Sequence, residues 1–194
     1  MNWLDPVGAG LSLICTYYFT QARRFAWILG ILAIMVNSLL YYQKGIYGSL
    51  VLEAIYFISM IYGLYQWSTP QKRLTTADIK FLTAKQFFVL CVIALGGFFV
   101  ASFLLTKTGS DIPYWDALTT TLSLIAQAML CLKIIHCWIL WFIVDAMMAA
   151  LQLYKGIPFH SAIHWSYLIL AVIGYIRWHQ LLKMQPMQTA KATQ

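Results

Sequence analysis

Hydrophobic residues follow one another in long continuous stretches along this chain, without the strict alternation of half-buried strands. A membrane-spanning helix needs about 20 mainly apolar residues. Charged residues, glycines and prolines divide the chain into seven such stretches, at 4–20, 25–43, 46–67, 86–106, 115–132, 137–154 and 161–178. Because a backbone in hydrocarbon must bond within helices or closed barrels, and the alternation of barrel strands is missing, we predict an all-α integral membrane protein with seven transmembrane helices.

The composition supports a lipid environment. Of 194 residues, 61% are hydrophobic and only 10% are charged, which is too few to cover the surface of a soluble domain. The net charge of +7 is spread between apolar stretches, so a nucleic-acid surface is excluded. The four cysteines lie in or beside apolar stretches without a CxxC pair, which argues against a secreted disulfide framework.

The basic residues predict an orientation, because lysine and arginine concentrate on the cytoplasmic side of membrane proteins. Three of the thirteen would lie outside: Lys44, Lys107 and Lys155. The other ten would lie inside: Arg23, Arg24, Lys72, Arg73, Lys80, Lys85, Lys133, Arg177, Lys183 and Lys191. This arrangement places the N-terminus outside and the C-terminus in the cytoplasm. It makes 68–85 a cytoplasmic linker and 179–194 a cytoplasmic tail, whose polar end from Met184 we expect to be disordered.

An internal repeat appears when the sequence is aligned with itself at an offset of 111 residues. Without a gap, Leu-Ser-Leu-Ile at 11–14 matches 122–125, Trp-Ile-Leu at 27–29 matches 138–140, and Lys-Gly-Ile at 44–46 matches 155–157. We predict a first three-helix repeat at 1–67, a central connecting helix at 86–106 and a second three-helix repeat at 112–178. One intervening helix gives both repeats the same orientation, an arrangement found in carriers. The alternative is a duplicated bundle without transport, as in a membrane enzyme or an assembly factor.

Polar residues inside the stretches point to a binding chamber, because they are costly in a membrane. Trp138, Trp141 and Asp145 have the spacing of one helical face. No Lys or Arg lies at the depth of Asp145, and indole faces attract cations. The sequence therefore predicts a pocket for a cation.

Further polar residues extend this pocket. They suit a planar, partly cationic small molecule better than a bare ion or a lipid tail. At the offset of 111, Glu53 and Tyr56 align with His164 and Tyr167. The remaining candidates are Ser123, Gln127 and Asn37. The alternative role of Ser123 is a hydrogen bond to its own helix backbone, and that of Asn37 is a hydrogen bond between helices.

Enzyme motifs are absent from the sequence. It contains no HExxH, GxSxG, P-loop or dinucleotide fingerprint, and its four histidines have no metal-binding spacing. We therefore expect neither an enzyme nor a bound cofactor or metal.

Two segments resemble the PnuC family of bacterial vitamin transporters, of the nicotinamide riboside transporter type. They are YYQKGIYGSLVLEAIYFISMIYGLYQW, at 41–67, and DALTTTLSLIAQAMLCLKIIHCWILWFIVDAMMAALQLYKG, at 116–156. The second carries the Ala-Gln, Trp-x-x-Trp and Asp-before-Tyr-Lys-Gly pattern of the family.

The resemblance implies a fold of two parallel three-helix repeats joined by one helix, related to the SWEET sugar carriers, and a homotrimer in the bacterial inner membrane. It implies facilitated uptake of a vitamin that a separate cytoplasmic kinase then traps by phosphorylation. By position, Trp138 and Trp141 would sandwich the planar ring, Asp145 would meet its charge or a ribose hydroxyl, and Gln127 would bond polar substituents.

Two cargoes and one other class stay open. Many relatives have Glu-Asn-Trp where this chain has His-Cys-Trp at 136–138, and Glu53 stands where Gln is frequent. These departures leave thiamine, another planar cation, as the alternative to nicotinamide riboside. A membrane assembly subunit without transport is the alternative of a different class.

Overall fold

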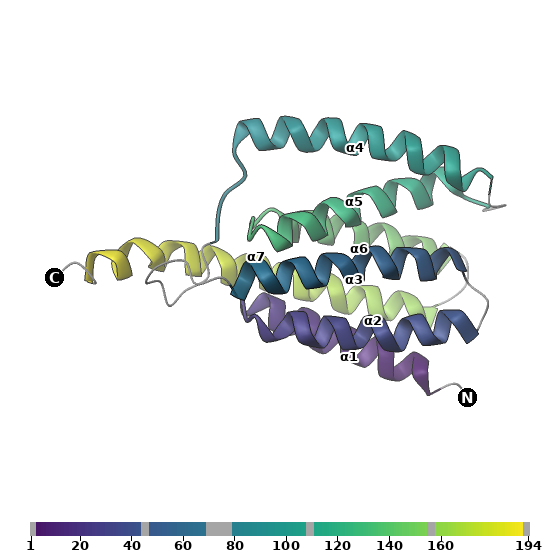
Figure 1. Cartoon of the computed structure of the whole chain (residues 1–194), viewed down its shortest axis with the longest axis horizontal. Helices are drawn as coiled ribbons and strands as arrows, with labels where there is room; N and C mark the ends of the chain where they lie inside the picture. The colour runs from purple at the N-terminus through teal and green to yellow at the C-terminus, as the bar shows by residue number, and fades with distance from the viewer. Residues whose placement is uncertain (1–2, 44–46, 69–78, 108–110, 155–157, 192–194) are drawn as a thin grey trace.

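The computed structural model describes residues 3–43, 47–68, 79–107, 111–154 and 158–191. Within these ranges the chain forms seven helices (Figure 1): α1 (Leu4–Thr20), α2 (Phe25–Gln43), α3 (Tyr47–Ser68), α4 (Ala84–Leu105), α5 (Pro113–Cys131), α6 (Cys137–Tyr154) and α7 (Pro158–Lys191). The predicted all-α class is confirmed. Helices α1, α2 and α6 have the predicted limits, and α3, α4 and α5 differ from them by one or two residues.

The last helix corrects one prediction. We expected the chain to leave its helix near residue 178 and the end of the tail to be disordered, but α7 continues to Lys191. Most of its residues beyond 178 are Leu, Lys, Met, Gln or Ala, which have high helix propensity. This part of α7 projects past the other helices in Figure 1.

The expectation of seven spans is supported for four helices. Helices α2, α4 and α6 and residues Leu50–Ser68 of α3 are long and apolar enough to cross a membrane. Helix α1 has only 17 residues. Helix α5 is richer in Thr, Ser and Gln, but ten of its residues are buried against other helices, so it needs less hydrocarbon-facing surface.

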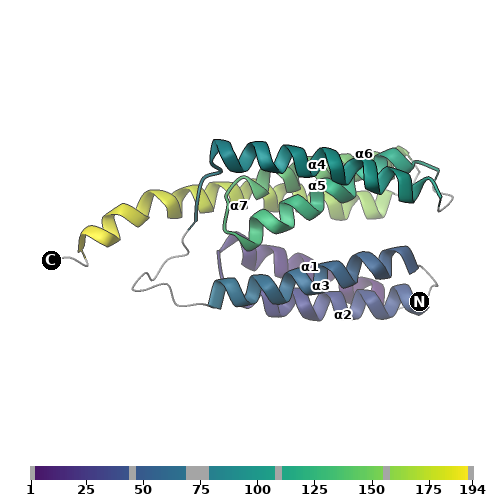
Figure 2. The same ribbon diagram turned by 45° about the horizontal axis from the view of Figure 1, so that its top comes forward.

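The helices form two groups of three with α4 outside them (Figures 1 and 2). Helices α1, α2 and α3 pack in order, as do α5, α6 and α7. We call α1–α3 the first half-unit and α5–α7 the second half-unit. They meet through α1 against α7 and α3 against α5, while α4 packs on α5.

The two half-units turn in the same way between their first two helices. Ala22 and Lys133, which are 111 residues apart, have positive φ angles of 52° and 58°. In each turn the next amide, that of Arg23 or Ile134, bonds the carbonyl five residues earlier. A left-handed residue of this kind commonly ends a helix by satisfying its last carbonyls. The aligned sequences thus form matching turns.

Matching tryptophan–glycine contacts hold the second and third helices of each half-unit together. Trp27 packs on Gly63 and Trp138 packs on Gly174, so closely that a Cβ atom at either glycine would overlap the indole. Small residues permit such close approach between membrane helices. The same contact therefore recurs at the offset of 111.

Two further tryptophans join the half-units to each other. The Trp67 Nε1 atom donates to the Cys131 carbonyl at 3.2 Å, and the Trp178 Nε1 atom donates to the Phe19 carbonyl at 3.0 Å. Their ring centroids lie 5.9 Å apart. Each half-unit thus bonds the end of the other's first helix.

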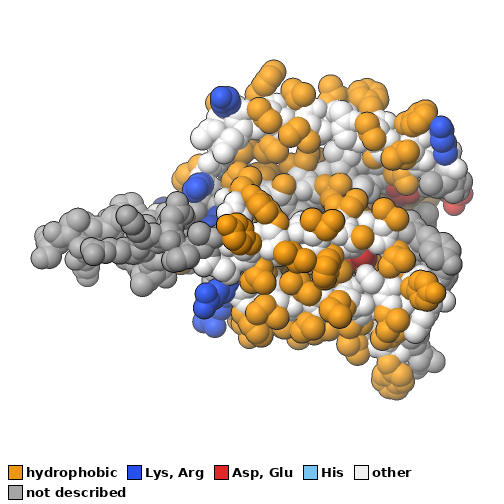
Figure 3. Space-filling model, viewed as in Figure 1, with side chains coloured by type: hydrophobic (Ala, Val, Ile, Leu, Met, Phe, Trp, Pro, Cys, Tyr) orange, Lys and Arg blue, Asp and Glu red, His pale blue; other side chains and the backbone are white. Residues whose placement is uncertain are grey.

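Most of the basic side chains visible in Figure 3 lie at the end of the bundle from which α7 projects, with fewer at the opposite end. Arg177 donates to Thr20 at 3.1 Å, and Lys80 forms a backbone bridge that ties the segment before α4 to the α5–α6 turn. Apolar side chains cover the helices between the two ends. Four basic residues used for the predicted orientation, Lys44, Lys72, Arg73 and Lys155, lie outside the described residues.

Candidate functional site

Two equivalent tyrosine–serine hydrogen bonds cross between the half-units near mid-helix. The Tyr56 hydroxyl on α3 donates to Ser123 Oγ on α5 at 2.8 Å. The Tyr167 hydroxyl on α7 is hydrogen-bonded to the Ser12 side chain on α1. All four residues match at the offset of 111. Tyrosine and serine side chains therefore occupy both contacts between the half-units.

Gln127 lies one helical turn from Ser123 and is 3% exposed. Its Nε2 atom donates to Ser59 Oγ on α3 at 3.1 Å. Ser59 in turn donates to the Tyr56 carbonyl at 2.7 Å. Ser123 and Gln127, the two candidates predicted on α5, thus face α3 and contact that helix directly.

Asp145 has a basic partner that we did not expect. Its Oδ1 atom lies 2.8 Å from His164 Nδ1 on α7. The sequence excluded Lys and Arg at the depth of Asp145, and the structure shows that a histidine is its basic partner. With a neutral imidazole whose Nδ1 proton points at the carboxylate, the pair keeps one negative charge. Protonation of Nε2 cancels that charge.

The first half-unit has a different polar pair at its corresponding place. The Glu53 carboxyl on α3 is hydrogen-bonded to the Asn37 side chain on α2. Glu53 aligns with His164, whereas Asn37 and Asp145 occupy neighbouring turns of the two aligned second helices. Each half-unit therefore places one carboxyl between its second and third helices.

The two carboxyl groups and the two tyrosines belong to one region. Tyr56 interacts electrostatically with both Glu53 and Asp145, and Tyr167 interacts with Asp145. We call this region the central cluster; its members are Ser12, Asn37, Glu53, Tyr56, Ser59, Ser123, Gln127, Asp145, His164 and Tyr167. It brings together seven of the nine sequence-predicted residues with three others, Ser12, Ser59 and His164. Its chemistry offers negative charge and hydroxyl and amide groups for a polar cation.

The two remaining predicted residues have different surroundings. Trp138 is 2% exposed, and its indole packs on Gly174 and, edge to face, on Trp178 with centroids 5.6 Å apart. Trp141 is half-buried at the margin of the apolar core. In this conformation Trp138 is a packing residue, so a sandwich of one ring between both tryptophans stays a prediction.

Three contributors to the central cluster were missed from the sequence. Ser59 carries no repeat match, since Leu170 stands at its aligned position. Ser12 did have a signal, because it matches Ser123 at the same offset at which Tyr56 matches Tyr167. The alignment of His164 with Glu53 was also visible, but it was not connected with Asp145.

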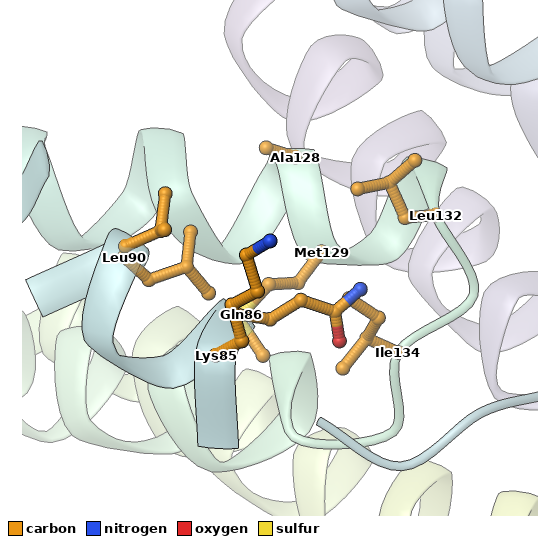
Figure 4. A pocket seen from close by; sticks show the side chains of 8 residues that line it. Lys85, Gln86, Leu90, Ala128, Met129, Leu132 and Ile134 are labelled. Atoms are coloured by element: carbon orange, nitrogen blue, oxygen red, sulfur yellow. The ribbon is translucent and has the colours of Figure 1, made fainter. Parts of the chain in front are cut away.

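A shallow groove of about 270 Å³ lies away from the central cluster, between the start of α4 and the end of α5. Lys85 and Gln86 line it together with apolar side chains such as Leu90, Met129 and Ile134 (Figure 4). It lacks the carboxyl and hydroxyl groups of the central cluster.

Comparisons with known proteins agree with this architecture. The chain is 23% identical over 201 residues to the nicotinamide riboside transporter PnuC of Escherichia coli (strain K12), covering 90% of this chain and 82% of that protein. It is 24% identical to the protein of the same name from Neisseria mucosa, covering 94% and 74%. A crystal structure described as the vitamin B3 transporter PnuC matches with a TM-score of 0.77 and 24% identity, covering 93% of this chain and 82% of the other.

The family assignment rests on nearly the whole chain. The sequence model of the family described as nicotinamide mononucleotide transporter matches residues 2–180, a range that contains both half-units, α4 and every member of the central cluster. The resemblance seen in the sequence is thereby confirmed. The chain belongs to the nicotinamide mononucleotide transporter family.

Proposed function

We propose that this protein lets nicotinamide riboside equilibrate across the bacterial inner membrane. The observation that carries the proposal is the central cluster, where two half-units meet with Asp145, Glu53 and paired tyrosine hydroxyls. Nicotinamide riboside combines a permanently cationic ring with an amide and a ribose. The carboxyls suit its charge, the hydroxyl and amide groups suit its polar substituents, and half-buried Trp141 suits its ring.

The architecture proposed for this function is a 3+1+3 arrangement of two parallel half-units joined by α4, similar to that of the SWEET carriers. Matching turns, tryptophan–glycine contacts and tyrosine–serine bonds at one offset support it. The half-units would rock against each other to expose the cluster alternately to each side. During that motion the direct Tyr56–Ser123 and Gln127–Ser59 contacts would give way to contacts with substrate.

The orientation and the partners are part of the same proposal. The N-terminus would lie outside and the C-terminus in the cytoplasm, as supported by the basic end of the bundle. Three copies would form a homotrimer. A separate cytoplasmic kinase would phosphorylate the riboside, and the added negative charge of the phosphate would keep the product inside. The chain itself would bind no cofactor and catalyse no reaction.

The test is equilibrium uptake of labelled nicotinamide riboside into proteoliposomes. We expect uptake to reach the external concentration without an ion gradient. Asp145→Asn should reduce the initial rate about tenfold or more, because a charge interaction in the low-dielectric interior is lost. Asp111→Asn makes the same chemical change at an exposed position and should leave the rate unchanged.

Two outcomes would contradict the proposal. Saturable uptake of thiamine that excludes the riboside would assign the other cargo. If neither vitamin binds, and Asp145→Asn changes only the thermal stability, the protein would be an assembly subunit whose polar residues hold helices together.

A further inference from the structure

The central cluster contains one group whose charge can oppose that of its carboxyls. His164 lies 2.8 Å from Asp145 and its side chain is 20% exposed, against 11% for the side chain of Asp145. Its second nitrogen, Nε2, can take a proton from water while Nδ1 stays bonded to the carboxylate. Protonation therefore changes the charge of the pair without breaking its contact.

The groups that surround this pair carry either negative charge or none. Asp145 faces it from α6, and Tyr167 on α7 has its ring centroid 6.0 Å from that of His164. Cys15 on α1 and Tyr41 on α2 interact with Tyr167. From the first half-unit, the titratable neighbours are Glu53 and Tyr56, which interact with the same region. Among these named groups, His164 is the one base.

The comparison of the half-units shows that this base is a local feature of the second. Its aligned residue, Glu53, is itself acidic and has an amide partner rather than an imidazole. The Asn37–Glu53 pair thus contains no group that can gain positive charge. In the second half-unit the same position holds His164, whose imidazole can gain positive charge.

We propose that His164 sets the charge of the central cluster, so that a cationic substrate binds when its imidazole is neutral and is released when Nε2 is protonated. The inference rests on the proposed function, since it presumes a cationic cargo at this cluster. His164 is a specificity-determining and positioning residue here. It holds the Asp145 carboxylate in place and controls how much negative charge the cargo meets.

The experiment measures the dissociation constant of nicotinamide riboside for the purified full chain between about pH 8 and about pH 5, a range that covers histidine titration. Binding should weaken about tenfold toward the acidic end. His164→Asn places an amide donor where Nδ1 stands but cannot be protonated. Whatever its affinity at about pH 8, this variant should lose most of the change in affinity between about pH 8 and about pH 5.

Two control variants make the result specific. His179→Asn makes the same change on the same helix, at a residue that stacks on Tyr175 outside the central cluster, and should keep the full pH dependence. Glu53→Gln removes the other side chain of the central cluster that can take up a proton, and the part of the pH dependence that is due to His164 should remain. A pH dependence that persists in His164→Asn and disappears in Glu53→Gln would overturn the inference.

A variant that fails to fold does not leave the question open. The parent protein alone can overturn the inference. If its affinity for the riboside is constant from about pH 8 to about pH 5, His164 does not set the charge of the cluster, although riboside binding stands. Absence of riboside binding at every pH would instead overturn the proposed function. The two failures are therefore distinguishable.

Discussion

The two half-units share a scaffold and differ in the polar groups that it carries. Trp27–Gly63 and Trp138–Gly174 are equivalent contacts, and Tyr56–Ser123 and Tyr167–Ser12 are equivalent bonds. Between the second and third helices, however, the first half-unit has an Asn37–Glu53 pair and the second has Asp145–His164. The tryptophan–glycine and tyrosine–serine contacts are thus alike in both copies, whereas the charged pair between the second and third helices differs.

The largest expected effect would break the shared scaffold. Gly63→Val and Gly174→Val each drive a side chain into an indole ring, on Trp27 and Trp138 respectively. Overpacking of this kind costs about 3 kcal/mol, so both variants should show a large loss of thermal stability in detergent. If the two contacts are equivalent, the two losses should be similar.

A glycine in open space gives the matched control. A Cβ atom at Gly10 would meet nothing within 4 Å, so Gly10→Ala should leave the melting temperature unchanged or raise it slightly. If Gly174→Val keeps the melting temperature while Gly63→Val lowers it, the tryptophan–glycine contacts inside the two half-units are not equivalent.

A smaller effect would test the bonds between the half-units. Tyr56→Phe and Tyr167→Phe each remove one hydroxyl from a tyrosine–serine bond, and hydrogen bonds between membrane helices contribute about 0.6 kcal/mol on average. Each variant should therefore lower the free energy of unfolding by about that amount. Unfolding titrations in mixed micelles measure it.

The control and the sharper result come from combining variants. Tyr154→Phe changes a tyrosine that is 89% exposed and should have no effect. The double variant of Tyr56 and Tyr167 should lose the sum of the single losses, because the two bonds join different pairs of helices. A loss confined to one tyrosine would contradict the equivalence of the two bonds.

Much of the fold was predictable because its signals are local in the sequence. Apolar runs ended by charges, glycine or proline gave helix limits close to those observed, and the ungapped offset of 111 identified residues that make matching contacts. The end of α7 was not predictable in this way. Its residues beyond 178 lack an apolar pattern, so the sequence there contains helix propensity but no signal of burial.

The central cluster was predictable as a set of residues and not as a set of contacts. Helical spacing predicted that Trp138, Trp141 and Asp145 share one face, but it could not show that Trp138 packs on Gly174. Spacing also cannot reveal a partner on another helix. His164 lies 19 residues from Asp145, and only the packing of α6 on α7 brings them together.

The measurement that tests the central claim most directly is a structure of the protein with nicotinamide riboside bound. The account predicts the ligand between the half-units, with its cationic ring near Asp145 and Trp141 and its ribose near Tyr56 or Gln127. A ligand found elsewhere, for example in the groove between α4 and α5, with the Asp145–His164 pair and both tyrosine–serine bonds undisturbed, would contradict it.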